Sequence, residues 1–132
     1  MTSDRAFNYS FTFWVYPRGA MIDSGSIFRY GNNDSVRAPG VWGIGAVKLQ
    51  FAIDAVTRDN CLWESTAFTL NVWAHVAIIV NTNQMLIYKN GVSVGQVDMR
   101  PFGGRKTYPP QNLFGGDDFY LRTCICHLLQ FY

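Results

Sequence analysis

Paired carboxylates are what hydrolysis of a glycosidic bond requires, one as the acid and one as the nucleophile or base. Glu64 is the single glutamate of the chain, and Asp117 and Asp118 are direct neighbours late in the sequence. Neighbouring acids of this kind are typical of solvated or metal-binding positions rather than of an acid–base pair. The carboxylates therefore predict that the chain is not an enzyme.

Histidine and cysteine are the other residue types that act as bases, nucleophiles or zinc ligands. His75 lies in an apolar segment with no partnered nucleophile nearby, so we expect a packed core or interface histidine. Cys124 and Cys126 share one face of a strand, but a zinc site needs four ligands and no second close pair exists. We expect the cysteines to be small buried side chains, and a disulfide from Cys61 to one of the others is the alternative.

Two oxygen-rich clusters suit a hard cation such as calcium, which binds carboxylate, amide and carbonyl oxygens presented by loops. The first is Asn32-Asn33-Asp34 and the second is Asp117-Asp118. The calcium ligands that these clusters predict are Asn33, Asp34, Asp117 and Asp118. The alternative is that the asparagines and aspartates make turns, which both residue types favour.

Aromatic side chains near turns are candidates for carbohydrate binding, which needs an aromatic platform with polar groups at its rim. The candidates for this ligand-binding role are Trp42, Trp63 and Tyr108. Five of the other aromatic residues lie in apolar segments and are expected in the core. These are Phe11, Phe13, Phe28, Phe51 and Trp73.

The elements that must position these residues are strands, because apolar residues recur at every second position and almost nowhere at helical spacing. Asn90-Gly91 predicts a tight hairpin, since a type I′ turn needs positive φ at both central residues. Short strands with frequent turns are typical of an all-β antiparallel sandwich. The expected strands span 7–16, 26–30, 40–44, 47–53, 61–70, 73–80, 85–89, 92–98 and 119–132, with a long loop at 99–112.

The length and charge of the chain limit the number of domains and the classes of partner. The 132 residues predict a single domain over residues 1–132. The net charge is +2 and the basic residues are scattered, so we expect no nucleic-acid partner. The longest apolar run, residues 76–80, is too short for membrane insertion, and no signal peptide follows Met1. Sequons at Asn8 and Asn33 favour an extracellular or cell-surface location.

Four short motifs follow one another along the chain. They are Phe-Thr-Phe-Trp-Val at 11–15, Trp-Ala-His-Val-Ala at 73–77, Leu-Ile-Tyr-Lys-Asn-Gly at 86–91 and Asn-Leu-Phe-Gly-Gly at 112–116. This ordered set resembles the laminin G-like and pentraxin branch of the concanavalin A-like jelly rolls, over nearly the whole chain. The resemblance implies two curved antiparallel sheets closed by a strand at 125–132. Pentraxins bind calcium at two places similar to the two clusters above.

Members of that branch usually carry a further strand before the Phe-Thr-Phe strand, and few residues precede it here. We therefore expect a sandwich that lacks the first strand and has an open edge, which a partner chain covers.

These features together predict a recognition module without enzymatic activity, in an adhesion protein or larger assembly. Its loops are expected to bind a glycan, a glycoprotein or another protein surface, assisted by calcium. The alternative is a structural or interaction subunit that packs on a partner protein and binds no glycan. Loss of glycan binding on Trp42→Ala or Trp63→Ala separates the two functions.

Overall fold

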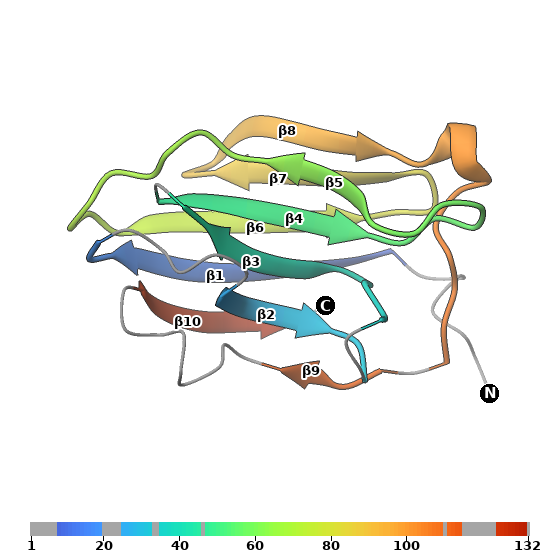
Figure 1. Cartoon of the computed structure of the whole chain (residues 1–132), viewed down its shortest axis with the longest axis horizontal. Helices are drawn as coiled ribbons and strands as arrows, with labels where there is room; N and C mark the ends of the chain where they lie inside the picture. The colour runs from blue at the N-terminus through green and yellow to red at the C-terminus, as the bar shows by residue number, and fades with distance from the viewer. Residues whose placement is uncertain are drawn as a thin grey trace.

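Two five-stranded antiparallel sheets form the computed structural model, which describes residues 8–19, 25–32, 35–45, 47–109, 111–114 and 124–131 (Figure 1). The first sheet has the order β10 (Cys124–Phe131), β1 (Tyr9–Pro17), β6 (Ala74–Val80), β7 (Gln84–Lys89) and β8 (Val92–Asp98). The second has the order β5 (Cys61–Glu64), β4 (Lys48–Ile53), β3 (Gly40–Ile44), β2 (Gly25–Tyr30) and β9 (Leu113–Phe114). The predicted all-β antiparallel sandwich is confirmed.

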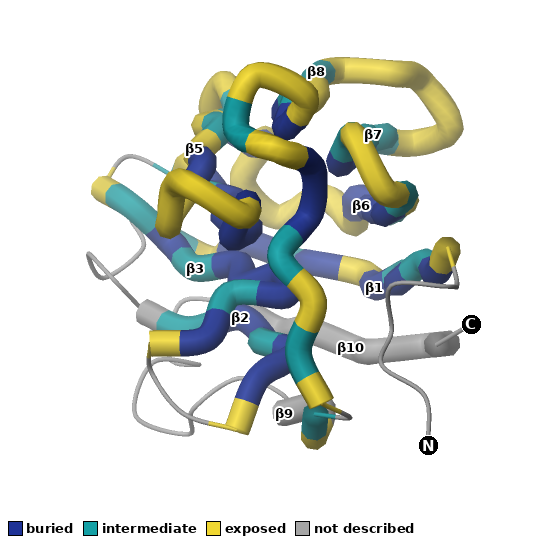
Figure 2. Tube along the Cα trace, turned by 90° about the vertical axis from the view of Figure 1, so that its right-hand side faces the viewer, coloured by how far each residue is buried: buried dark blue, intermediate teal, exposed yellow. Residues whose placement is uncertain are grey.

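The core lies between the two sheets, as Figure 2 shows by the buried positions that gather between the layers. Every odd position of β1 is buried, as the alternating sequence predicts. The rings of Phe11 and Phe13 each lie 5.4 Å from the ring of Phe28 in β2, so aromatic contacts join the sheets. The predicted core positions of these three residues and of Phe51 are confirmed.

Strand β6 buries its even positions, and this turns its odd positions to the outer face. Trp73, one residue before the strand, is 42% exposed. The ring of His75 lies 5.0 Å from the ring of Trp14, which is itself 37% exposed. The prediction that Trp73 belongs to the core is therefore wrong, and so is the core alternative for His75.

The predicted hairpin joins β7 to β8. Asn90 and Gly91 have φ values of 50° and 80°, as a type I′ turn requires. The side-chain oxygen of Asn90 also accepts the backbone N–H of His75 over 2.9 Å, which attaches the turn to β6. The predicted hairpin is confirmed, and β6, β7 and β8 form a three-stranded antiparallel meander.

The strand predicted over 61–70 ends earlier, at Glu64. The backbone N–H of Leu49 in β4 donates to the hydroxyl of Ser65 over 2.9 Å. A side-chain oxygen thus takes the place of the carbonyl that a continuing strand would offer. The prediction is wrong beyond Glu64 for this reason.

Residues 99–112 cross from the first sheet to the second. They begin with the short 3₁₀ turn η2 (Arg100–Phe102). Ala55 and Arg105 form an isolated bridge, and the backbone N–H of Lys106 donates to the carbonyl of Asp54 over 3.0 Å. The crossover is thus attached to the residues that follow β4.

Strand β1 lies between β10 and β6, so it is not a sheet edge. The edge strands among the described residues are β10 and β8 in one sheet and β5 and β9 in the other. The expectation that a partner chain covers an open edge stays a prediction. No helix in the described ranges has the length and apolar character to cross a membrane.

Candidate functional site

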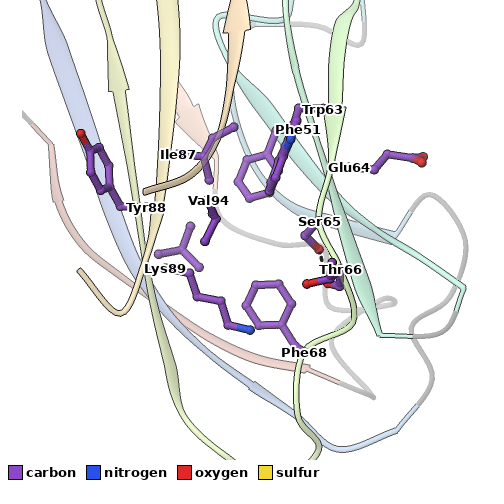
Figure 3. Close-up of a pocket in the computed structure, with 11 residues that line it drawn as sticks. Phe51, Trp63, Glu64, Ser65, Thr66, Phe68, Ile87, Tyr88, Lys89 and Val94 are labelled. Atoms are coloured by element: carbon purple, nitrogen blue, oxygen red, sulfur yellow. Dashed lines mark hydrogen bonds between the residues drawn. The ribbon is translucent and has the colours of Figure 1, made fainter. Parts of the chain in front are cut away.

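A pocket of about 390 Å³ lies between β5 and β8, where an edge strand of each sheet meets the other (Figure 3). Trp63 and Phe68 line it from the side of the second sheet, and Lys89 and Val94 line it from the first. Its volume falls within the range of roughly 300–1,000 Å³ that is typical of small-molecule sites. We call this cavity the edge pocket.

Aromatic rings form one wall of the edge pocket. Cys61 and Trp63 occupy alternate positions of β5 and turn inward, while Leu62 between them is 51% exposed. Trp63 pairs in register with Phe51 of β4, and their ring centroids lie 5.6 Å apart. Phe68, in the segment after β5, adds a third ring and is 5% exposed. Strand register therefore brings Phe51 and Trp63 to one cavity, and the segment after β5 adds Phe68.

Gly95 of β8 allows the two sheets to approach at this edge. A Cβ atom built on Gly95 would lie 2.1 Å from the Cε2 atom of Trp63, far inside van der Waals contact. Glycine is the residue that leaves room for the indole against the β8 backbone. Gly95 thus fixes where the Trp63 ring lies.

Lys89 supplies the positive charge of the pocket. Alternation along β7 turns Met85 and Ile87 to the core, and Lys89 continues the same face at the end of the strand. Its ammonium nitrogen lies 4.2 Å from the ring centroid of Phe68, a cation–π contact. Figure 3 shows the Lys89 side chain reaching toward Phe68, while Tyr88 points away from the cavity.

Two other polar side chains that line the pocket, Glu64 and Ser65, form hydrogen bonds within the protein. The carboxylate of Glu64 accepts a hydrogen bond from Gln50 over 2.9 Å, and Figure 3 shows its side chain directed away from the cavity. The hydroxyl of Ser65 donates to the carbonyl of Thr66 over 2.7 Å. Among the charged side chains that line the pocket, Lys89 is the one that reaches along the cavity.

Trp42 lies on the outer face of the second sheet. Its indole N–H donates to Gln50 over 2.5 Å, and the guanidinium of Arg37 lies 5.2 Å from its ring centroid. Cross-strand register places Trp42, Gln50 and Glu64 in one row. Because Trp63 faces the interior, the structure does not bring these two tryptophans together.

Tyr108 belongs to the crossover and not to the lining of the edge pocket. Its hydroxyl donates to the carboxylate of Asp54 over 2.6 Å. Burial raises the pKa of Tyr108 above its ordinary value, and the bond to Asp54 raises it further. The ammonium of Lys106 lies 5.5 Å from the tyrosine ring. These contacts give Tyr108 a structural role between two loops.

The calcium prediction falls on residues that the structure does not describe. Asn33, Asp34, Asp117 and Asp118 all lie outside the described ranges. Within those ranges, no group of three or more His, Cys, Asp or Glu side chains is placed to hold a metal ion. Calcium binding at the two clusters stays a prediction.

Cys61 is a buried free thiol, as expected for a small core side chain. Burial raises the pKa of its thiol above the ordinary value. The side chains of Cys124 and Cys126 are outside the description.

An aromatic cluster on the outer face of the first sheet was not predicted. The rings of Trp14 and Trp73 lie 6.4 Å apart, and the ring of Tyr16 lies 5.1 Å from that of Trp73. We call Trp14, Tyr16, Trp73 and His75 the outer aromatic patch. The signal for it was present, because the alternation that buries Phe11 and Phe13 turns Trp14 outward.

The sequence did not identify Phe68 and Lys89 as lining residues of the edge pocket, nor Gly95 as the residue that packs against Trp63. A glycine within a strand signals a close approach by another group, and an inward-facing lysine in a strand is unusual. Neither signal says which element lies opposite. Which element lies opposite becomes clear only from the structure, in which the edge strand β5 of one sheet meets the edge strand β8 of the other.

Several solved structures share the fold of this chain at low sequence identity. The binding domain of Paraclostridial Mosquitocidal Protein 1 has a TM-score of 0.69 and 12% identity, covering 95% of this chain and 33% of that one. The binding domain of botulinum neurotoxin DC in complex with SialylT has a TM-score of 0.63 and 18% identity, with 95% and 31% coverage. The same domain in complex with rat synaptotagmin II has a TM-score of 0.62 and 18% identity, again with 95% and 31% coverage.

This chain therefore spans about a third of the length of these neighbours. No curated protein sequence gives a significant match. A laminin G-type family model, described as the concanavalin A-like lectin/glucanases superfamily, matches residues 2–123. By that match, which covers most of its length, the chain belongs to the concanavalin A-like lectin/glucanase superfamily.

Proposed function

We propose that this domain is a non-enzymatic recognition module that binds a saccharide in the edge pocket, outside the cell or at its surface. The observation that carries the proposal is the meeting of three aromatic rings around one cavity with a cation at its side. A pyranose ring has apolar C–H faces and polar hydroxyl edges, so it suits stacking on indole and phenyl rings beside polar donors. The similarity in fold to binding domains, one of them solved with SialylT, supports this function.

A glycan array probed with the purified domain tests the proposal, followed by titration of the strongest saccharide. We expect Trp63→Ala to weaken binding by about tenfold or more, since buried aromatic residues dominate binding energy. Trp42→Ala is the matched control, because Trp42 lies on the opposite face of the same sheet. Equal loss in both variants, or no loss in Trp63→Ala, would overturn the assignment to the edge pocket.

A second variant removes the concern that Trp63→Ala weakens the fold itself. Val94 lines the pocket but is 41% exposed at the edge strand, so Val94→Trp adds bulk at the mouth without entering the core. We expect this variant to unfold at the wild-type temperature and to lose saccharide binding.

The alternative function is packing on a partner protein with no glycan binding. The outer aromatic patch favours it, with Trp14 and Trp73 37% and 42% exposed on one sheet face. A solved neighbour in complex with rat synaptotagmin II also supports a protein partner. Under this alternative, partner binding is lost in Trp14→Ser and Trp73→Ser and is unaffected by Trp63→Ala.

A further inference from the structure

We propose, building on saccharide binding in the edge pocket, that the pocket selects an acidic saccharide and that Lys89 pairs with its carboxylate. The chemical class is a sugar whose ring carries a carboxyl group, as in a uronic acid. The Lys89 ammonium lies beside the aromatic wall of the pocket, and no acid in the described part of the chain pairs with it.

The position of Lys89 is set by the fold. It ends the inward-facing row of β7, directly before the Asn90-Gly91 turn, so its partly exposed side chain extends along the pocket. The ring of Phe68, 4.2 Å from the ammonium nitrogen, holds the charge beside the aromatic wall. An ammonium has three N–H donors, and a single ring contact leaves donors for a ligand.

Every acid in the described ranges is engaged elsewhere. Asp98 pairs with Arg100 over 2.9 Å, and Asp59 pairs with Lys106 over 3.5 Å. The remaining two, Asp54 and Glu64, accept hydrogen bonds from Tyr108 and Gln50, respectively. Lys89 forms no ion pair with any of these four carboxylates. A partly buried cation that pairs with no carboxylate of the described ranges favours a ligand that supplies one.

A matched pair of sugars tests the inference. Methyl β-D-glucuronide and methyl β-D-glucoside differ only in the oxidation state of C6, so their affinities isolate the carboxylate. By NMR titration of the whole domain, we expect the glucuronide to bind about tenfold more tightly at low salt. The preference is expected to shrink as ionic strength rises, because Lys89 is partly exposed to solvent.

Two variants assign the preference to Lys89. Lys89→Met keeps an unbranched apolar side chain against Phe68 and is expected to bind both sugars with equal affinity. Lys89→Arg keeps the charge and is expected to retain the preference. A preference for the glucuronide that survives in Lys89→Met would overturn the inference, as would equal affinities in the wild-type domain.

Failure of the inference differs from failure of the proposed function. If both sugars bind equally and Trp63→Ala loses both, the pocket binds saccharides without charge selection. If neither sugar binds, saccharide binding itself is contradicted. Octanoate carries the same carboxylate on an alkyl chain, and binding of octanoate alone would reassign the pocket to an alkyl acid and overturn both.

Discussion

Tyr108 links two loops through the hydrogen bond that its hydroxyl donates to Asp54. Its hydroxyl is one of three donors to the carboxylate of Asp54, and the others are the backbone N–H groups of Arg37 and Asn60 at 3.0 and 2.9 Å. Asp54 is only 1% exposed, so these donors replace the water that its carboxylate has lost. Removal of the Tyr108 hydroxyl leaves the buried Asp54 carboxylate with one hydrogen bond fewer.

Tyr108→Phe is therefore expected to lower the free energy of unfolding by about 1–2 kcal/mol, measured by urea denaturation at neutral pH. The raised pKa of Tyr108 adds a pH dependence. As pH rises past about 10, the unfolded chain ionises this tyrosine before the folded protein does, so the unfolded state is favoured. The wild-type domain should lose stability more steeply there than Tyr108→Phe. Parallel stability curves would contradict this role.

The edge pocket depends on the close approach of strand β8 to strand β5. Gly95 has no side chain, and the indole of Trp63 occupies the space where a Cβ atom would lie. Gly91, in the turn that opens β8, provides a comparison, because its φ is 80° and nothing lies within 4 Å of a Cβ atom there. The two glycines are thus required for different reasons.

Gly95→Ala is expected to destabilise the fold by about 1–3 kcal/mol through overpacking against Trp63. The cost should shrink in a Trp63→Ala background, where the indole is gone, and a double-mutant cycle by chemical denaturation measures this coupling. Gly91→Ala is the control, with a cost of about 1–2 kcal/mol from backbone strain and no coupling to Trp63. Additive costs for Gly95 and Trp63 would contradict the packing described.

Strands and hairpin were predictable because their signals are local. Alternation of apolar residues identifies the buried face of β1. The Asn90-Gly91 pair specifies the turn between β7 and β8 without reference to the rest of the chain. Trp73 was expected in the core because its side chain is large and apolar. Its odd position, in line with the outward-facing odd residues of β6, places it on the outer face instead. The edge pocket escaped prediction because it joins Trp63 of one sheet to Lys89 of the other, and sequence alone does not say which edges meet.

The four predicted calcium ligands come from two segments far apart in the sequence, so calcium binding would join distant parts of the chain. A cation that binds only the native state at 100 times its Kd adds about 2.7 kcal/mol of stability. We predict that calcium raises the midpoint of thermal unfolding by several degrees and that a chelator reverses the rise. An Asp117→Asn, Asp118→Asn double variant should lose the effect. The same midpoint with calcium and with chelator would contradict the prediction.

NMR of the tryptophan indoles tests whether a ligand enters the edge pocket between the two sheets. The chain has four tryptophans, and Trp→Phe variants assign their four indole N–H signals. On titration with methyl β-D-glucuronide, we predict that the Trp63 signal shifts with saturation while those of Trp14, Trp42 and Trp73 stay in place. An unmoved Trp63 signal, or a shift confined to Trp42, would contradict the account.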